Sequence, residues 1–196
     1  MKIGIDIDDT TVFTVKPMIK FADIFDKEIL KRKGNNNNFG EIKNRYYLEQ
    51  LYGWNEETKY KFFDLYYKNV LEECELIKDA DSVINKLKKL GNEIFFVTAR
   101  LTNIKRCDTK QITIDTLNKN NILYDKLILN AKDKLRVCKE YGIEMFIEDS
   151  YETCVELEQN GIKTFLMSTK MNKDIKTKTV ERVNSWLELY NKFLKQ

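Results

Sequence analysis

The 196-residue sequence contains no histidine. This absence excludes Ser-His-Asp and Cys-His catalysis, imidazole zinc sites and histidine general bases. Any proton transfer in an active site must therefore use carboxylates, lysine, tyrosine or cysteine.

Several other features are also missing. The four cysteines show no C-x-x-C spacing, and we interpret them as reduced, mostly buried thiols. No apolar run approaches the ~18 residues of a membrane span, and the N-terminus enters a strand-like run with aspartates rather than a secretory signal. The net charge of +3 is too weak to indicate stable nucleic-acid binding. We therefore expect a cytoplasmic protein without a membrane partner, and the sequence predicts no oligomeric state.

Short apolar segments alternate with helical patterns along most of the chain. The segments that predict strands are 2–7, 93–97, 126–129, 145–147 and 163–166. The intervals that predict helices are 81–90, 109–120, 133–141, 151–160 and about 179–195. The alternation predicts an α/β fold, a Rossmann-like parallel sheet of about five strands covered by helices on both faces.

One long interval, between Phe13 and Lys78, contains helical patterns and no convincing strand. The patterns cover about 16–31 and 41–51, and a third helix follows Asn55, a residue suited to an N-cap. A polar loop, 34–38, separates the first two. We interpret the interval as a helical cap, residues 13–78, inserted into a core domain made of residues 1–12 and 79–196.

Polar side chains follow several of the predicted strands. Asp6 and Asp8 lie two residues apart at the end of the first strand, so they project to the same face. In open parallel sheets, ligands bind at the carboxyl ends of the strands. The other polar residues expected at this edge are Thr98, Arg100, Lys134, Glu148 and Asp149. We assign no role to Asp9.

This order of residues resembles the haloacid dehalogenase-like (HAD) superfamily of phosphohydrolases. The first HAD motif, D-x-D-x-T, is matched by 6–10, and the second, a Ser or Thr after the next core strand, by Thr98. The third motif is a lysine, for which we choose Lys134 over its close competitor Lys132. The fourth is an acidic pair, matched by 148–149.

The resemblance implies a Mg²⁺ site and an aspartyl-phosphate intermediate. The Asp6 carboxylate, the Asp8 backbone carbonyl and the Asp149 side chain would bind Mg²⁺, and Glu148 would hold a metal-bound water. Asp6 would be the nucleophile. Asp8 would protonate the leaving oxygen and then deprotonate the hydrolytic water, so we expect its pKa to be raised.

The remaining motif residues would contact the phosphoryl group. The resemblance implies that the Thr98 hydroxyl and the Lys134 ammonium hold its oxygens. Arg100 is either a phosphate contact, and so part of the substrate-binding set, or a surface residue. The acid at Asp8 favours phosphoryl transfer over dehalogenation, because a halide leaves without a proton.

The predicted cap contains 13 of the 23 aromatic residues. Most should form the core of a small helical bundle, while one or two could stack on a base; Phe13 and Tyr46 are candidates by position. Within the superfamily the chain is similar to the 5′(3′)-deoxyribonucleotidases and their bacterial relatives, through F-V-T-A-R at 96–100, Y-D-K-L at 124–127 and D-K-x-x-x-C at 133–138. Glu148 departs from that family, which carries Asp there.

These observations predict a Mg²⁺-dependent phosphomonoesterase whose partner is a small phosphomonoester, most consistently a nucleoside (deoxy)monophosphate. The alternatives are a phosphatase for a sugar phosphate or a nucleic-acid 3′-phosphate, and a phospho-accepting signalling domain. The cap and the acid at Asp8 favour turnover over signalling.

Overall fold

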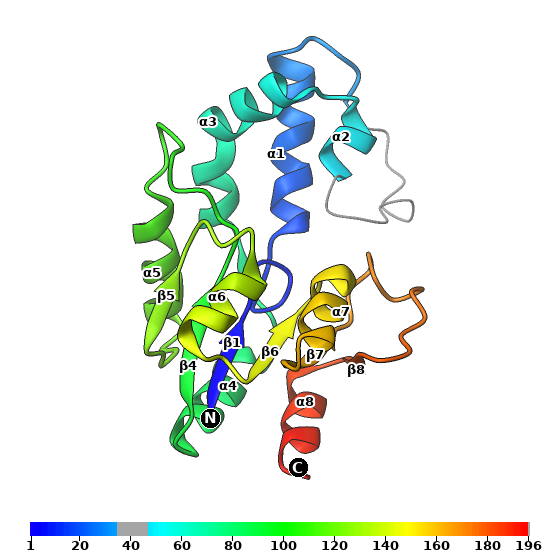
Figure 1. Cartoon of the computed structure of the whole chain (residues 1–196). Coiled ribbons are helices and arrows are strands. Elements are labelled where there is room, and N and C mark those ends of the chain that lie inside the picture. The colour runs from blue at the N-terminus through cyan, green and yellow to red at the C-terminus, as the bar shows by residue number, and fades with distance from the viewer. Residues whose placement is uncertain (35–46, 196) are drawn as a thin grey trace.

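A six-stranded parallel sheet forms the centre of the protein (Figure 1). The structure is a computed structural model that describes residues 1–34 and 47–195. The strand order is β5-β4-β1-β6-β7-β8. The strands are β1 (Lys2–Ile5), β4 (Glu93–Val97), β5 (Lys126–Ile128), β6 (Met145–Glu148), β7 (Lys163–Met167) and β8 (Glu181–Val183). The predicted α/β class with a Rossmann-like parallel sheet is confirmed, with one strand more than expected.

Helices cover both faces of this sheet. The helices are α4 (Ala80–Lys89), α5 (Thr109–Lys119), α6 (Lys134–Tyr141), α7 (Tyr151–Gln159) and α8 (Trp186–Phe193). Residues of α4, α5 and α8 pack with Ile3 and Ile5 on one face, and residues of α6 and α7 pack with Phe146 on the other. Each fully buried Ile or Phe contributes about 1.5–3 kcal/mol to this core.

Gly4 on β1 is covered closely by the side chain of Phe146 on the neighbouring strand β6. A Cβ atom at this position would come within 2.4 Å of the Phe146 ring. A glycine inside a strand usually marks such a close approach. The small residue therefore lets a large aromatic side chain cover β1 two residues before Asp6.

The C-terminal segment differs from the prediction of one helix over about 179–195. Residues Glu181–Val183 form β8, which pairs with β7 in the register Phe165↔Glu181. Helix α8 begins only after Ser185, whose side chain accepts a hydrogen bond from the Glu188 backbone N–H. The helical expectation is wrong here because pairing with a neighbouring strand outweighs the local preference of three residues.

The interval between β1 and α4 holds the helices α1 (Val15–Glu28), α2 (Tyr47–Tyr52) and α3 (Glu56–Glu72), which lie together beyond one end of the sheet (Figure 1). We call residues 13–78 the helical insert. The side chain of Asn55 caps α3 by accepting from the Thr58 N–H at 2.9 Å, as expected. Most of the predicted loop 34–38 and the first part of the predicted helix 41–51 lie outside the described residues.

Two short strands at the base of the insert were not expected. They are β2 (Val12–Phe13) and β3 (Glu75–Leu76), which pair antiparallel. Each has only two residues, too few to give an alternating pattern in the sequence. Their pairing brings the start and the end of the insert side by side.

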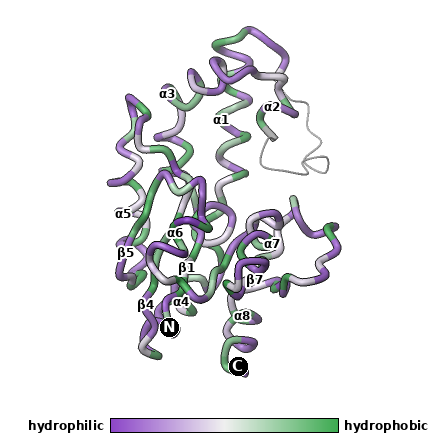
Figure 2. Tube along the Cα trace, viewed as in Figure 1, coloured by the Kyte–Doolittle hydropathy of each residue, from purple (hydrophilic) through white to green (hydrophobic). Residues whose placement is uncertain are grey.

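Aromatic residues form the interior of the insert. The rings of Phe25 and Trp54 meet edge to face with centroids 5.1 Å apart, and Phe62 packs against both. The Trp54 indole N–H donates to buried Asp26 at 2.9 Å. Helix α1 alternates between hydrophobic and hydrophilic positions (Figure 2), as an amphipathic helix with one buried side should. Among the described residues, no helix is both long and apolar enough to cross a membrane.

Candidate active site

A cavity of about 650 Å³ lies between the carboxyl ends of the central strands and the helical insert. Its core side carries every residue that the sequence assigned to the site. These residues are Asp6, Asp8, Thr98, Arg100, Lys134, Glu148 and Asp149, with the competitor Lys132. The strand ends therefore meet at one edge, as the parallel order requires.

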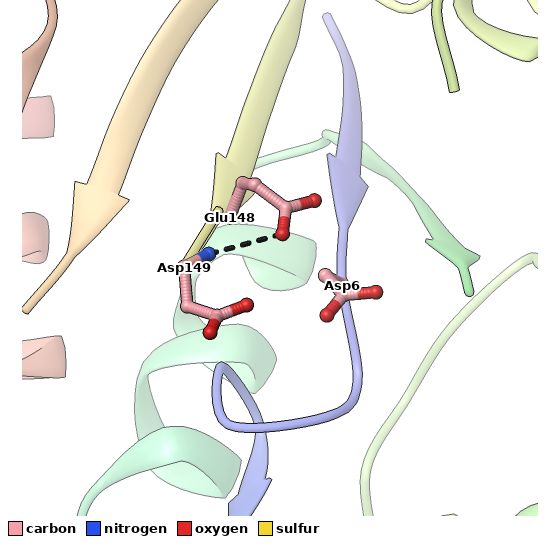
Figure 3. Close-up of side chains that lie close together, drawn as sticks. All are labelled: Asp6, Glu148 and Asp149. Carbon is pink, nitrogen blue, oxygen red and sulfur yellow. Dashed lines mark hydrogen bonds between the residues drawn. The ribbon is translucent and has the colours of Figure 1, made fainter. Parts of the chain in front are cut away.

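Three carboxylates meet at the base of the cavity (Figure 3). Asp6 follows β1, and Glu148 and Asp149 lie at the end of the neighbouring strand β6. Each residue offers a carboxylate oxygen, and these atoms lie within 4.8 Å of one another. The Asp6 backbone is fixed by its N–H, which donates to the carbonyl of Ile147 at 2.9 Å.

Lys134 binds two of these carboxylates. Its Nζ lies 2.7 Å from Asp6 Oδ1 and 2.5 Å from Glu148 Oε2. Burial lowers the pKa of Lys134, but the charges of Asp6 and Glu148 raise it by more than burial lowers it. The net pKa is above the usual value, so the ammonium is retained. Lys132 is exposed, although it also lines the cavity. The geometry thus places Lys134, rather than Lys132, against Asp6.

The cluster holds more negative charge than Lys134 neutralises. Burial raises the pKa of Asp6 to about 8; Lys134 opposes this rise and the charge of Glu148 adds to it. Burial and the charge of Glu148 also raise the pKa of Asp149 well above its usual range. A divalent cation would offset this repulsion, and an oxygen-only donor set is the type that Mg²⁺ prefers. The residues therefore fit a Mg²⁺ ion.

The Asp8 carboxylate is held by Arg100. The Arg100 Nη2 and Nε atoms donate to Asp8 at 2.8 and 3.1 Å, and Nη1 donates to Thr113 at 3.0 Å. Thr98 Oγ1 lies 3.4 Å from Asp8 Oδ2. Arg100 is only 3% exposed, so the alternative of a surface residue is wrong, while a phosphate contact stays a prediction.

The pKa of Asp8 differs from the raised value that the sequence predicts. Burial raises it, but the charge and the hydrogen bonds of Arg100 outweigh burial, and the net pKa is below the usual value. The expected raised pKa in the free protein is therefore wrong. The sequence suggested nearby carboxylates as the dominant influence, whereas the guanidinium is the closest charged partner.

Asp9 and Thr14 have structural roles that the sequence analysis missed. Asp9 has a left-handed backbone (φ 55°), and its Oδ1 accepts the N–H groups of Thr14 at 3.0 Å and Val15 at 3.2 Å. It thereby caps α1, while Thr14 Oγ1 donates to Asp8 at 2.6 Å. The sequence carries no N-cap signal for this contact, because Asp9 lies five residues before Thr14, the N-cap residue of α1. These contacts connect the Asp6–Asp9 turn directly to the helical insert.

Comparisons with known proteins identify the family. No family model matches the chain. A nucleotidase of Clostridium acetobutylicum is 33% identical over 147 residues, which cover 74% of this chain and 73% of that protein. A solved structure described as a predicted phosphatase of the same species has a TM-score of 0.73 at 16% identity, with 100% of this chain and 98% of that one covered. A Bacillus subtilis protein described as a HAD hydrolase bound to magnesium has a TM-score of 0.64 at 16% identity, with 98% of each chain covered. The chain belongs to the HAD superfamily of hydrolases.

In this HAD hydrolase the insert supplies the other side of the cavity. The aromatic residues there are Tyr60, Phe63 and Tyr67, all from α3. The sequence candidate Phe13 is not among the lining residues; it lies on β2, is half exposed, and lines a separate surface hollow. Tyr46 lies outside the described residues. Helical periodicity alone did not distinguish cavity-facing aromatics from those of the aromatic core.

Proposed function

We propose that this HAD hydrolase is a Mg²⁺-dependent phosphomonoesterase that forms an aspartyl-phosphate, with the helical insert acting as its cap. The observation that carries the proposal is the cluster of buried Asp6, buried Glu148 and half-buried Asp149 at the base of a large cavity, where Lys134 binds Asp6 and Glu148. Asp8 follows the nucleophile position by two residues and faces the same cavity. A nucleophile, an acid–base group and a cation site are thus available together.

The charged residues at the base of the cavity would allow a carboxylate to approach a phosphate. Asp6, Asp149, Glu148 and the Asp8 carbonyl would hold Mg²⁺, which neutralises negative charge and orients the phosphoryl group when bound. Lys134 contacts the proposed nucleophile directly, at 2.7 Å. Lys134 and the Thr98 hydroxyl would hold the phosphoryl oxygens during transfer.

Two proton transfers are assigned to Asp8. An Asp6 oxygen attacks phosphorus, and the departing ester oxygen takes a proton from Asp8 as its bond breaks. Water then attacks phosphorus and gives its proton to Asp8, which releases inorganic phosphate and regenerates the Asp6 carboxylate. Arg100 keeps Asp8 ionised in the free protein, a form suited to the second step. The negative charge of an arriving phosphoryl group raises the pKa of Asp8 for the first.

Nucleoside 5′-monophosphates are the proposed substrates. The cavity volume of about 650 Å³ is within the range typical of small-molecule sites. The Tyr60 and Phe63 rings and the apolar side chains of Met18 and Leu48 line its cap side, and aromatic faces stack well on bases. The nucleotidase name of the relative from C. acetobutylicum supports the same substrate class.

A phosphate-release panel tests both levels of the proposal. Purified protein with Mg²⁺ is assayed with nucleoside 5′-monophosphates, their 3′ isomers, sugar phosphates and a small aryl phosphate. We expect 5′-nucleotides to give the highest kcat/KM, and EDTA to abolish release until Mg²⁺ is restored. Activity that persists after exhaustive EDTA treatment would contradict the metal assignment. Sugar phosphates that exceed every nucleotide tenfold would contradict the nucleotide assignment and leave phosphomonoesterase activity standing.

A further inference from the structure

The segment 168–180, which connects β7 to β8, forms part of the cavity wall. Met171, Asn172 and Ile175 line the cavity beside Asp149. Asn172 is buried, at 3% exposure, and belongs to none of the four HAD motifs. A buried asparagine next to a charged site needs a physical explanation, because an unpaired buried amide is costly.

Every hydrogen-bonding position of the Asn172 side chain is already occupied within the protein. Nδ2 donates to the carbonyls of Asp149 at 2.7 Å and Met167 at 2.8 Å. Oδ1 accepts from the Thr169 N–H at 3.0 Å and from Arg182 Nη1 at 2.7 Å. An asparagine amide has two donor hydrogens and two acceptor lone pairs. Asn172 therefore has no capacity for a substrate unless one of these bonds breaks.

The contact with Asp149 completes a clamp on its backbone. Glu148 Oε1 accepts the N–H groups of Asp149 at 3.2 Å and Ser150 at 3.0 Å, while Asn172 holds the Asp149 carbonyl. The polar backbone groups on both sides of the Asp149 side chain are thus fixed by two different side chains. This backbone orientation directs the Asp149 carboxylate toward Asp6 (Figure 3).

Arg182 on β8 fixes the segment 168–180 through hydrogen bonds. Its Nη2 donates to the carbonyls of Asn172 at 3.0 Å and Ile175 at 2.8 Å, in addition to the contact of Nη1 with Asn172 Oδ1. Strand β8 pairs in turn with β7. A continuous set of hydrogen bonds therefore runs from the edge of the sheet to the Asp149 carbonyl.

We propose that Asn172 is a positioning residue for the divalent-cation site: it fixes the Asp149 turn so that the carboxylate stays within reach of a cation shared with Asp6. This inference rests on the cation site of the proposed function. Asn172 acts through Asp149 and does not contact the reacting atoms. Partners that orient metal ligands commonly affect metal affinity about 10- to 100-fold.

The test compares Asn172→Asp with wild type. The aspartate keeps both acceptor contacts, with Thr169 and Arg182, and loses both donated bonds. Its added negative charge would by itself attract Mg²⁺, so weaker Mg²⁺ binding identifies the lost donated bonds as the cause. Asn160→Asp is the matched control, because exposed Asn160 also donates to a carbonyl, that of Glu156, and accepts from Lys139.

Two readouts are measured for each protein. The first is the Mg²⁺ concentration that gives half of the maximal rise in Tm, which needs no substrate. The second is the Mg²⁺ concentration for half-maximal phosphate release, with KM at saturating Mg²⁺. For Asn172→Asp we expect both Mg²⁺ midpoints to increase about tenfold and KM to stay within about twofold. Asn160→Asp should match wild type in all three values.

A second variant guards against loss of folding. Arg182→Lys keeps the charge but removes the forked contacts with the loop, and we expect a smaller increase in the Mg²⁺ midpoint. Unchanged midpoints in folded Asn172→Asp overturn the proposal, as does a raised KM with unchanged midpoints, which would indicate substrate binding. Unfolding of both variants also counts against it, because the role would then be purely structural. If no substrate is hydrolysed but Mg²⁺ still raises Tm, the proposed function fails while the Tm comparison decides this inference.

Discussion

The core side and the cap side of the cavity differ in both chemistry and packing. At the edge of the sheet, the side chains of Asp6, Lys134 and Glu148 are ionisable and buried, and Lys134 donates hydrogen bonds to both carboxyl groups. On α3, Tyr60 is 45% exposed and Phe63 is partly buried. Under the proposed function, the core side would transfer the phosphoryl group and the cap side would select what is attached to it. This comparison predicts that core substitutions affect all substrates and cap substitutions only some.

The largest effect is expected for Asp6→Asn. An amide is a poor nucleophile and a weak metal ligand, so phosphate release should fall at least about 10⁴-fold with every substrate. Exposed Asp115 on α5 provides a matched control, Asp115→Asn, whose rates should equal those of wild type. Turnover in Asp6→Asn at more than a hundredth of the wild-type rate would show that Asp6 is not the nucleophile. It would also contradict the prediction that core substitutions affect all substrates.

Asp8→Asn should reduce activity in a way that depends on the leaving group. General acid–base catalysis is typically worth about 10²–10⁴-fold, so a nucleotide should lose that much while an aryl phosphate with an acidic phenol loses less in the first step. Comparing kcat/KM for the two esters measures this difference. Equal losses would show that Asp8 is not the acid.

The same substitution should also lower stability. It leaves the buried Arg100 guanidinium without its anionic partner. Removing one charge of a fully buried pair costs about 3–5 kcal/mol, and we expect a smaller loss here because the Asp8 side chain is 31% exposed. Urea unfolding of Asp8→Asn, compared with Asp115→Asn, measures the loss in the free energy of unfolding. A wild-type midpoint would mean that Arg100 is compensated by other groups.

How far the sequence predicts each region follows from the type of contact involved. Asp6, Lys134 and Asp149 could be brought together in advance because the carboxyl ends of parallel strands share one edge. The orientation of Asp8 could not, because it depends on a side-chain pair with Arg100, 92 residues away. In the insert, amphipathic spacing predicts α1 and α3, but not which aromatic rings face the cavity.

Short elements show the same limit. Strand β8 has three residues, and β2 and β3 have two each, so none gives a pattern that the sequence alone can reveal. Each forms because a partner strand is present. Interactions that depend on tertiary neighbours, including the Asn172 contacts, are therefore the part that only the structure provides.

A comparison of two lysines tests how sharply the core side is defined. Lys134→Ala should lower kcat about 10²–10³-fold, the range seen when a group stabilising transition-state charge is removed. The substitution also leaves the carboxyl groups of Asp6 and Glu148 without their cationic partner. Lys132→Ala, at the exposed neighbour, should change kcat less than about threefold. Steady-state kinetics on one nucleotide measures both. The reverse order would move the third motif to Lys132.

The smallest effect is expected on the cap side, for Tyr60→Ala. This ring lines the cavity, is 45% exposed and is not part of the buried aromatic cluster of the insert, so its removal should leave that cluster intact. A stacked base contributes about 1–3 kcal/mol, so kcat/KM for a nucleoside monophosphate should fall about 5- to 150-fold. A small aryl phosphate, which does not reach the cap, should be hydrolysed at nearly the wild-type rate.

Phe13→Ala is the control for Tyr60→Ala, because Phe13 is also an exposed aromatic of the insert but faces a different hollow. Its kcat/KM should stay at the wild-type value with both substrates. If Tyr60→Ala lowers the aryl phosphate and the nucleotide rates equally, Tyr60 influences the core site rather than the base. If Phe13→Ala is instead the variant that loses nucleotide activity, base recognition lies at the position that the sequence suggested, and selection occurs outside this cavity.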